Sequence, residues 1–172
     1  MKRQLVRVIA CMAVISAALA QFPTNVAGQT SAAPQTLGIG FQSAFPAYGA
    51  SVIYNAPSGA SVQGILGAFA DLKMYAGRVR YRFQPNGNVH PYAFGTLGLW
   101  SYDGYRAGTY SVEKTTESVF GVGGGAGIEY FFAGMPSLGF NAEIGFGSAK
   151  FKDIDYNFSA IGVGVGLHYY IR

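Results

Sequence analysis

Apolar residues alternate with small or polar residues along most of the chain after residue 36, which is the pattern of β-strands with two different faces. The alternation is clearest in residues 120–132, 138–147 and 160–172. In the last of these the odd positions are Ile161, Val163, Val165, Leu167, Tyr169 and Ile171, and the even positions are Ala160, three glycines, His168, Tyr170 and Arg172. These segments predict strands with one apolar face and one small or polar face.

The pattern predicts eight strands joined in an up-and-down order. Their approximate ranges are 36–45, 48–55, 60–70, 72–83, 90–102, 117–132, 138–148 and 159–172. Residues 55–59, 84–88 and 133–137 are short turns that each contain a proline and a glycine. The connections 103–116 and 149–158, at the other end, are long. Short connections at one end and long ones at the other are typical of outer-membrane barrels.

Three arginines indicate which face is polar. Arg78, Arg80 and Arg82 occupy alternate positions of the predicted strand 72–83, so their guanidinium groups share one face. Exposure to lipid would cost about 2–4 kcal/mol for each arginine near the membrane midplane. We therefore expect this face to line a polar lumen and the apolar face to contact lipid. A soluble lipocalin-type carrier, with the apolar face inward, is the alternative.

The polar faces predict a network inside the barrel. Its predicted members are Arg78, Arg80, Arg82, Glu129, Asn141, Glu143, His168 and Arg172. Opposite charges in an interior of low dielectric constant are tolerable when they are paired, and side chains fill the interior of an eight-stranded barrel. We therefore expect a closed lumen. A small-solute pore, with these residues as its selectivity filter, is the alternative.

Aromatic residues near the short turns predict a girdle at one membrane interface. With the strand phases taken from the alternation, the residues predicted to point outward are Tyr54, Tyr81, Phe83, Tyr92, Phe94, Tyr130, Phe132, Phe140 and Tyr169.

The N-terminus has the order of a secretory signal peptide. A basic start is followed by the apolar run 8–19 and by Ala18-Leu19-Ala20, so we expect a signal peptide at residues 1–20 and cleavage before Gln21. Residues 21–35 form a flexible leader, and residues 36–172 form the barrel. The chain has 12 Lys and Arg against 8 Asp and Glu, and loss of the signal leaves nine basic residues against eight acidic ones. No basic patch remains, so nucleic acid is not an expected partner.

Composition narrows the class further. Cys11 is the only cysteine and lies in the predicted signal, so the mature protein is expected to have neither disulfide nor thiol. Only 12% of residues are charged and 25 are glycine, whereas about a quarter of an ordinary soluble domain is charged. No run after residue 20 reaches the roughly 18 apolar residues of a spanning helix, so a membrane-embedded form must use strands.

From about Leu37 to Arg172 the chain resembles the small eight-stranded outer-membrane β-barrel proteins of Gram-negative-type bacteria. The best local match is the last strand, Val163–Arg172, although its Ile171-Arg172 ending differs from the terminal aromatic residue of that class. The resemblance implies an all-β fold: an eight-stranded antiparallel up-and-down transmembrane β-barrel preceded by a signal peptide. It also implies an outer-membrane location, with membrane lipid and the barrel-assembly machinery as partners.

Some small barrels of this kind modify lipid A, so catalysis is a further alternative. His90 and His168 both fall near the short-turn, periplasmic end, and neither has a partner at metal-ligand spacing. The run Gly121–Ala126 matches a dinucleotide fingerprint, but it lies inside a strand and not at a strand-to-helix turn. We therefore expect no enzyme activity, cofactor or metal.

The long connection Asp103–Thr116 is the predicted interaction segment. It contains Tyr105, Arg106 and Tyr110, and its composition suits a β-ribbon that extends above the membrane and offers a free edge. The preferred function is a structural or adhesion-like surface role, with a ligand that the sequence does not identify.

Overall fold

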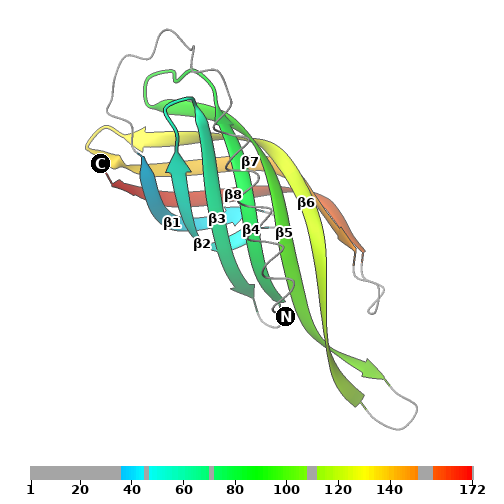
Figure 1. Ribbon diagram of the computed structural model, residues 1–172. Helices are drawn as coiled ribbons and strands as arrows, with labels where there is room; N and C mark the ends of the chain where they lie inside the picture. Colours follow the sequence, from blue (N-terminus) through cyan, green and yellow to red (C-terminus); the bar gives the residue numbers. More distant parts are fainter. Residues whose placement is uncertain (1–35, 45–46, 70–71, 108–111, 151–156, 172) are drawn as a thin grey trace.

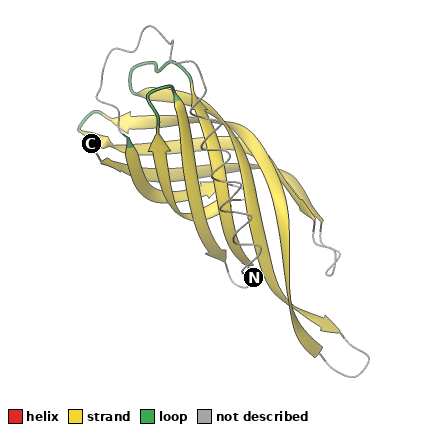
Figure 2. Ribbon diagram, in the orientation of Figure 1, coloured by secondary structure: helices red, strands yellow, loops and turns green. Residues whose placement is uncertain are grey.

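The structure is a computed structural model that describes residues 36–44, 47–69, 72–107, 112–150 and 157–171, and every regular element in it is a strand (Figure 2). The strands are β1 (Leu37–Ala44), β2 (Ala47–Asn55), β3 (Ala60–Phe69), β4 (Leu72–Arg82), β5 (Val89–Ala107), β6 (Val112–Phe132), β7 (Met135–Lys150) and β8 (Asn157–Ile171). Each strand pairs with the next and β8 pairs with β1, so the antiparallel sheet closes into a barrel (Figure 1). This confirms the predicted fold, while the predicted signal peptide and leader lie outside the described residues. In the described part of the chain no helix is long and apolar enough to cross a membrane.

The strand registers fix the stagger of the barrel. A path perpendicular to the strands starts at Tyr130 on β6, passes through all the other strands and returns to β6 at Phe120, ten residues away. The intermediate partners are Phe140, Leu167, Phe41, Ala50, Leu66, Tyr75 and Leu99. With the standard rise per residue and strand spacing, a stagger of ten over eight strands corresponds to a tilt of about 40°. The barrel is thus narrow, and inward side chains from opposite walls meet.

Tight turns close one end of the barrel, which we call the short-turn end. The β2–β3 turn contains Gly59 with φ of 86°, and the β4–β5 turn contains Gly87 with φ of 59°. Glycine adopts such positive φ values without a steric penalty. The β4–β5 turn is also held by reciprocal backbone hydrogen bonds between Asn86 and Val89. The end of β8 lies beside the β6–β7 turn at this same end (Figure 1).

The opposite end, the hairpin end, is uneven because β5 and β6 extend far beyond their neighbours (Figure 1). Residues 103–116 were predicted as a connection, but β5 continues to Ala107 and β6 begins at Val112. The two strands stay paired through Ala107 and Val112, so most of this segment is the β-ribbon that its composition suggested.

The two faces of the strands lie in opposite environments. On β8, Ile161 and Val163 point outward and are each 79% exposed, whereas His168 points inward and is fully buried. The same arrangement holds on β4, where Tyr75 and Tyr81 are outward and exposed while Arg78 and Arg80 are buried. The barrel therefore has an apolar outer surface and a polar interior, the reverse of a soluble carrier barrel.

Two members of the predicted aromatic girdle were assigned to the wrong face. Tyr92 and Phe94 are buried in the lumen, because their rings support the guanidinium groups of Arg80 and Arg78. The remaining seven are outward and exposed: Tyr54, Tyr81, Phe83, Tyr130, Phe132, Phe140 and Tyr169.

The interior has two parts. Polar and charged side chains occupy the middle of the lumen and its short-turn end. Toward the hairpin end lies a cluster that we call the apolar layer, made of Ile65, Met74, Ala76, Trp100, Val119 and Ala149.

Candidate functional site: the luminal polar network

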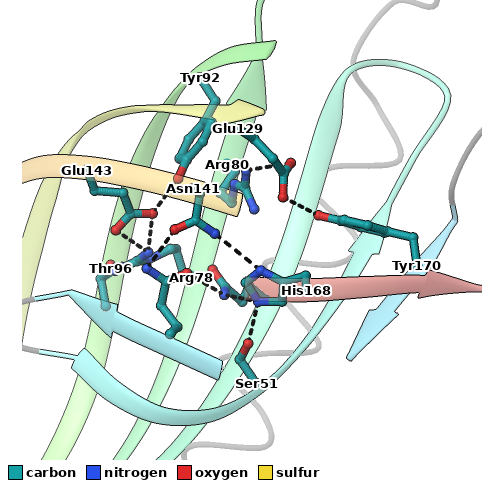
Figure 3. A network of polar contacts seen from close by, with 12 residues as sticks. Ser51, Arg78, Arg80, Tyr92, Thr96, Glu129, Asn141, Glu143, His168 and Tyr170 are labelled. Carbon is teal, nitrogen blue, oxygen red and sulfur yellow. Dashed lines mark hydrogen bonds and ion pairs between the residues drawn. The ribbon is translucent and has the colours of Figure 1, made fainter. Parts of the chain in front are cut away.

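The polar network is assembled from inward positions of all eight strands, and Figure 3 shows its ion pairs and the contacts of His168. Because side chains alternate along a strand, residues two apart share the lumen. In this way β4 supplies Arg78 and Arg80, and β8 supplies His168 and Tyr170. The others are Gln42, Ser51, Asn55, Ser61, Gln63, Tyr92, Thr96, Glu129, Asn141 and Glu143.

One ion pair crosses the lumen from β4 to β7. Arg78 Nη1 lies 2.7 Å from Glu143 Oε1 and 2.8 Å from Oε2. Arg78 Nε donates to Thr96 Oγ1 at 3.0 Å, and the Tyr92 hydroxyl donates to Glu143 Oε1 at 2.6 Å. The Arg78 guanidinium also lies 4.2 Å from the centre of the Phe94 ring. Both charges thus have several partners, which offset the cost of their burial, while Arg78 Nη2 has no hydrogen-bond partner among the described residues.

A second ion pair lies closer to the short-turn end. Arg80 Nη2 donates to Glu129 Oε2 at 3.2 Å, and the Tyr170 hydroxyl donates to Glu129 Oε1 at 2.6 Å. The Arg80 guanidinium stacks on Tyr92 at 3.7 Å from the ring centre, a favourable cation–π geometry. Tyr92 therefore links the two pairs, because its ring contacts Arg80 and its hydroxyl contacts Glu143 (Figure 3).

Amide side chains and His168 form a third group of hydrogen-bonded side chains. Gln63 Nε2 donates to Gln42 Oε1, Gln42 Nε2 donates to Asn141 Oδ1, and Asn141 Nδ2 lies 3.2 Å from His168 Nδ1. An amide nitrogen only donates, so amide donors face both ring nitrogens of His168: Asn141 faces Nδ1, and Gln63 Nε2 lies 3.3 Å from Nε2. Ser51 Oγ lies 2.5 Å from the same Nε2.

Glycines on neighbouring strands make room for these groups. A Cβ at Gly166 would lie 2.6 Å from Gln42 Oε1 and 2.7 Å from Asn141 Oδ1. A Cβ at Gly139 would lie 3.0 Å from both Glu129 and Tyr170. The inward glycines thus leave the volume that the large polar side chains of the adjacent strands occupy.

The other predicted site residues lie elsewhere. Arg82 is at the short-turn rim, where Nη2 donates to the Ala56 carbonyl at 3.0 Å and makes no ion pair among the described residues. Arg172 and Tyr110 lie outside the described residues. Tyr105 and Arg106 belong to the projecting part of β5, opposite Lys114 and Glu113 of β6.

Several network members were missed from the sequence. Tyr92 was placed outside, and Gln42, Ser51, Gln63, Thr96 and Tyr170 were not among the predicted members. Tyr170 shares the phase of His168 on the last strand, so the alternation contained the signal for it. Within the described residues there is no group of three or more His, Cys, Asp or Glu side chains that could hold a metal ion.

A family model described as "Outer membrane protein beta-barrel domain" matches residues 12–169. The chain belongs to this family. Membership places the barrel in the outer membrane of a Gram-negative bacterium, where its apolar outer surface contacts lipid. No curated protein matches the sequence significantly.

Solved structures with a similar fold include Neisserial surface protein A (NspA), with 17% identity, a TM-score of 0.52 and coverage of 78% of this chain and 93% of that one. The N-terminal β-barrel domain of Pseudomonas aeruginosa OprF is 18% identical, with a TM-score of 0.47 and coverage of 77% and 95%. The Yersinia pestis outer membrane protein Ail is 16% identical, with a TM-score of 0.39 and coverage of 77% and 97%. At this level of identity, the similarity to NspA shows a shared fold and no shared function.

Proposed function

We propose that this family member is a non-enzymatic barrel with a closed lumen that acts at the cell surface through the β5–β6 hairpin, in an adhesion-like role. The observation that carries the proposal is the projection of this hairpin beyond the rest of the barrel (Figure 1). A β-strand with unpaired backbone groups can accept a strand from a partner protein.

The pairing pattern leaves two edges of the hairpin without a neighbouring strand among the described residues. β4 pairs with β5 only as far as Tyr102, so residues 103–107 pair with β6 alone. β7 pairs with β6 only from Gly121 onward, so residues 112–120 pair with β5 alone. The base of the hairpin is fixed by Asp103, which accepts from Thr116 at 2.7 Å and from Lys73 at 3.4 Å.

The burial of the polar network supports a closed lumen and not a small-solute pore. Arg78 and Arg80 are each 1% exposed, and His168 is inaccessible. The four buried carboxylate and guanidinium groups form two ion pairs, so they offer no excess charge of one sign to select a permeating ion.

Ser51, His168 and Asn141 superficially resemble a nucleophile, a base and an orienting residue. A base must accept the nucleophile's proton at its facing nitrogen. Here the amide nitrogen of Gln63 lies 3.3 Å from the nitrogen of His168 that faces Ser51 and competes with Ser51 for it, and both Ser51 and His168 are buried. This arrangement supports a structural role for His168 and disfavours hydrolysis of lipid A or any other ester.

Replacement of residues 104–115 by an Asn-Gly turn tests the surface role. The turn suits the register of Asp103 opposite Thr116, so the barrel should still form. We expect cells that display the full chain to adhere to at least one of a panel of protein-coated surfaces, and cells that display the variant to lose this adherence. Equal adherence of the two, at matched amounts of folded barrel, would contradict the proposal, as would a full chain that confers none.

A further inference from the structure

The apolar layer lies in the lumen at a level different from that of the ion pairs. Its members come from five consecutive strands, β3 to β7, and their exposed fractions run from 0% to 8%. Leu72 packs against it from the hairpin side. Arg78 lies two residues along β4 from Ala76. The apolar layer is therefore next to the Arg78–Glu143 ion pair, on the side of the hairpin end.

Trp100 is the largest side chain of this layer. It is 3% exposed, and its register partners are Met74 on β4 and Val119 on β6, both also in the layer. Its indole occupies space that two glycines leave free. A Cβ at Gly98 would lie 2.4 Å from Trp100 Cη2, and a Cβ at Gly121 would lie 2.7 Å from Cζ3.

The two layers differ in how they oppose permeation. A polar layer offers hydrogen-bonding groups to water and ions, so rearrangement of its side chains can create a hydrated path. An apolar constriction excludes water and ions by dewetting, because it offers nothing to replace their hydration. The layer around Trp100 therefore forms the higher barrier even though it contains no charge.

We propose that the apolar layer centred on Trp100 is the main permeability barrier of this barrel, and that the buried ion pairs fill the lumen without setting that barrier. This inference rests on the closed lumen of the proposed function. Under this assignment the buried charges act neither as a selectivity filter nor as a gate; these are Arg78, Arg80, Glu129 and Glu143.

Conductance of the purified full chain in planar lipid bilayers tests the assignment. We expect no current steps from the wild type or from Glu143→Gln, which weakens the ion pair at nearly constant volume. We expect stable steps from Trp100→Ser, which opens the layer, and none from Trp100→Phe, which keeps it apolar. Tyr102→Ser is the matched control and should also give no steps. Tyr102 lies two residues further along β5, outside the apolar layer, and is 37% exposed.

Each preparation is first checked for a barrel band that shifts on boiling. If Trp100→Ser gives no folded barrel, Met74→Ser removes the facing side chain and makes the same test. Steps from Glu143→Gln, or silence from folded Trp100→Ser and Met74→Ser, would overturn the assignment of the barrier. Steps from the wild type would instead overturn the closed lumen itself, so the two failures are distinguishable.

Discussion

Glu143→Ala is expected to lower the free energy of unfolding by about 3–5 kcal/mol, because it leaves the buried guanidinium of Arg78 without its counter-charge. The substitution also removes the acceptor of the Tyr92 hydroxyl. Urea unfolding of the protein in lipid vesicles measures the change. Trp100 is the only tryptophan and is buried in the lumen, so its fluorescence reports unfolding directly.

Lys73→Ala is the control for this prediction. It breaks the exposed ion pair Lys73–Asp103, in which the lysine side chain is 55% exposed, so the expected loss is about 0–1 kcal/mol. The double replacement Arg78→Met with Glu143→Leu removes both charges and should recover most of the stability. Equal effects of Glu143→Ala and Lys73→Ala would show that the luminal pair is not essential to the fold.

Ile144→Arg is expected to destabilise the barrel by about 2–4 kcal/mol, because it places a charge in the middle of the lipid-facing surface. Ile144 is outward, 58% exposed, and its register partners Ala126 and Val163 are apolar. It lies between the outward rings of Phe140 and Phe146 on the same strand. The same vesicle unfolding experiment measures the loss.

Met135→Arg is the matched control, since Met135 is on the same strand and is 57% exposed. It begins β7 at the short-turn end, near the interface, where an arginine costs about 0–1 kcal/mol. Equal costs at the two positions would mean that the apolar outer surface does not contact lipid.

The sequence predicts the architecture well where lipid and lumen impose opposite demands on successive residues. On the last strand, Ile161 to Ile171 at odd positions face lipid, and small or polar residues face the lumen, so the period of two is clear. The placement of Arg78 and Arg80 follows from the same rule, since no lipid-facing position tolerates them at low cost.

The alternation of apolar and polar positions does not distinguish the two faces of β5, because both of them are apolar. Tyr92 and Phe94 look like interface residues, but they line the lumen as supports for guanidinium groups, and Leu97 and Leu99 face outward. Hydrophobicity alone does not distinguish a ring that contacts lipid from one that stacks on an arginine. The arginines on the neighbouring strand, two residues apart, were the available signal.

The pairing of charges was not predictable either. Arg78 meets Glu143 and Arg80 meets Glu129 across the lumen, between strands that are not neighbours in the sheet. Which pairs form depends on the stagger of ten residues, and the stagger follows only from all eight registers together. The amide chain from Gln63 to His168 depends on the same closure, since it joins β3, β1, β7 and β8.

A closed barrel with its apolar face in the lipid of the outer membrane is most directly tested by fractionation. The full chain is expressed, outer membrane is separated from periplasm, and each fraction is run on a detergent gel with and without boiling. We expect a band in the outer-membrane fraction whose migration changes on boiling. A soluble periplasmic band with the same migration before and after boiling would contradict it.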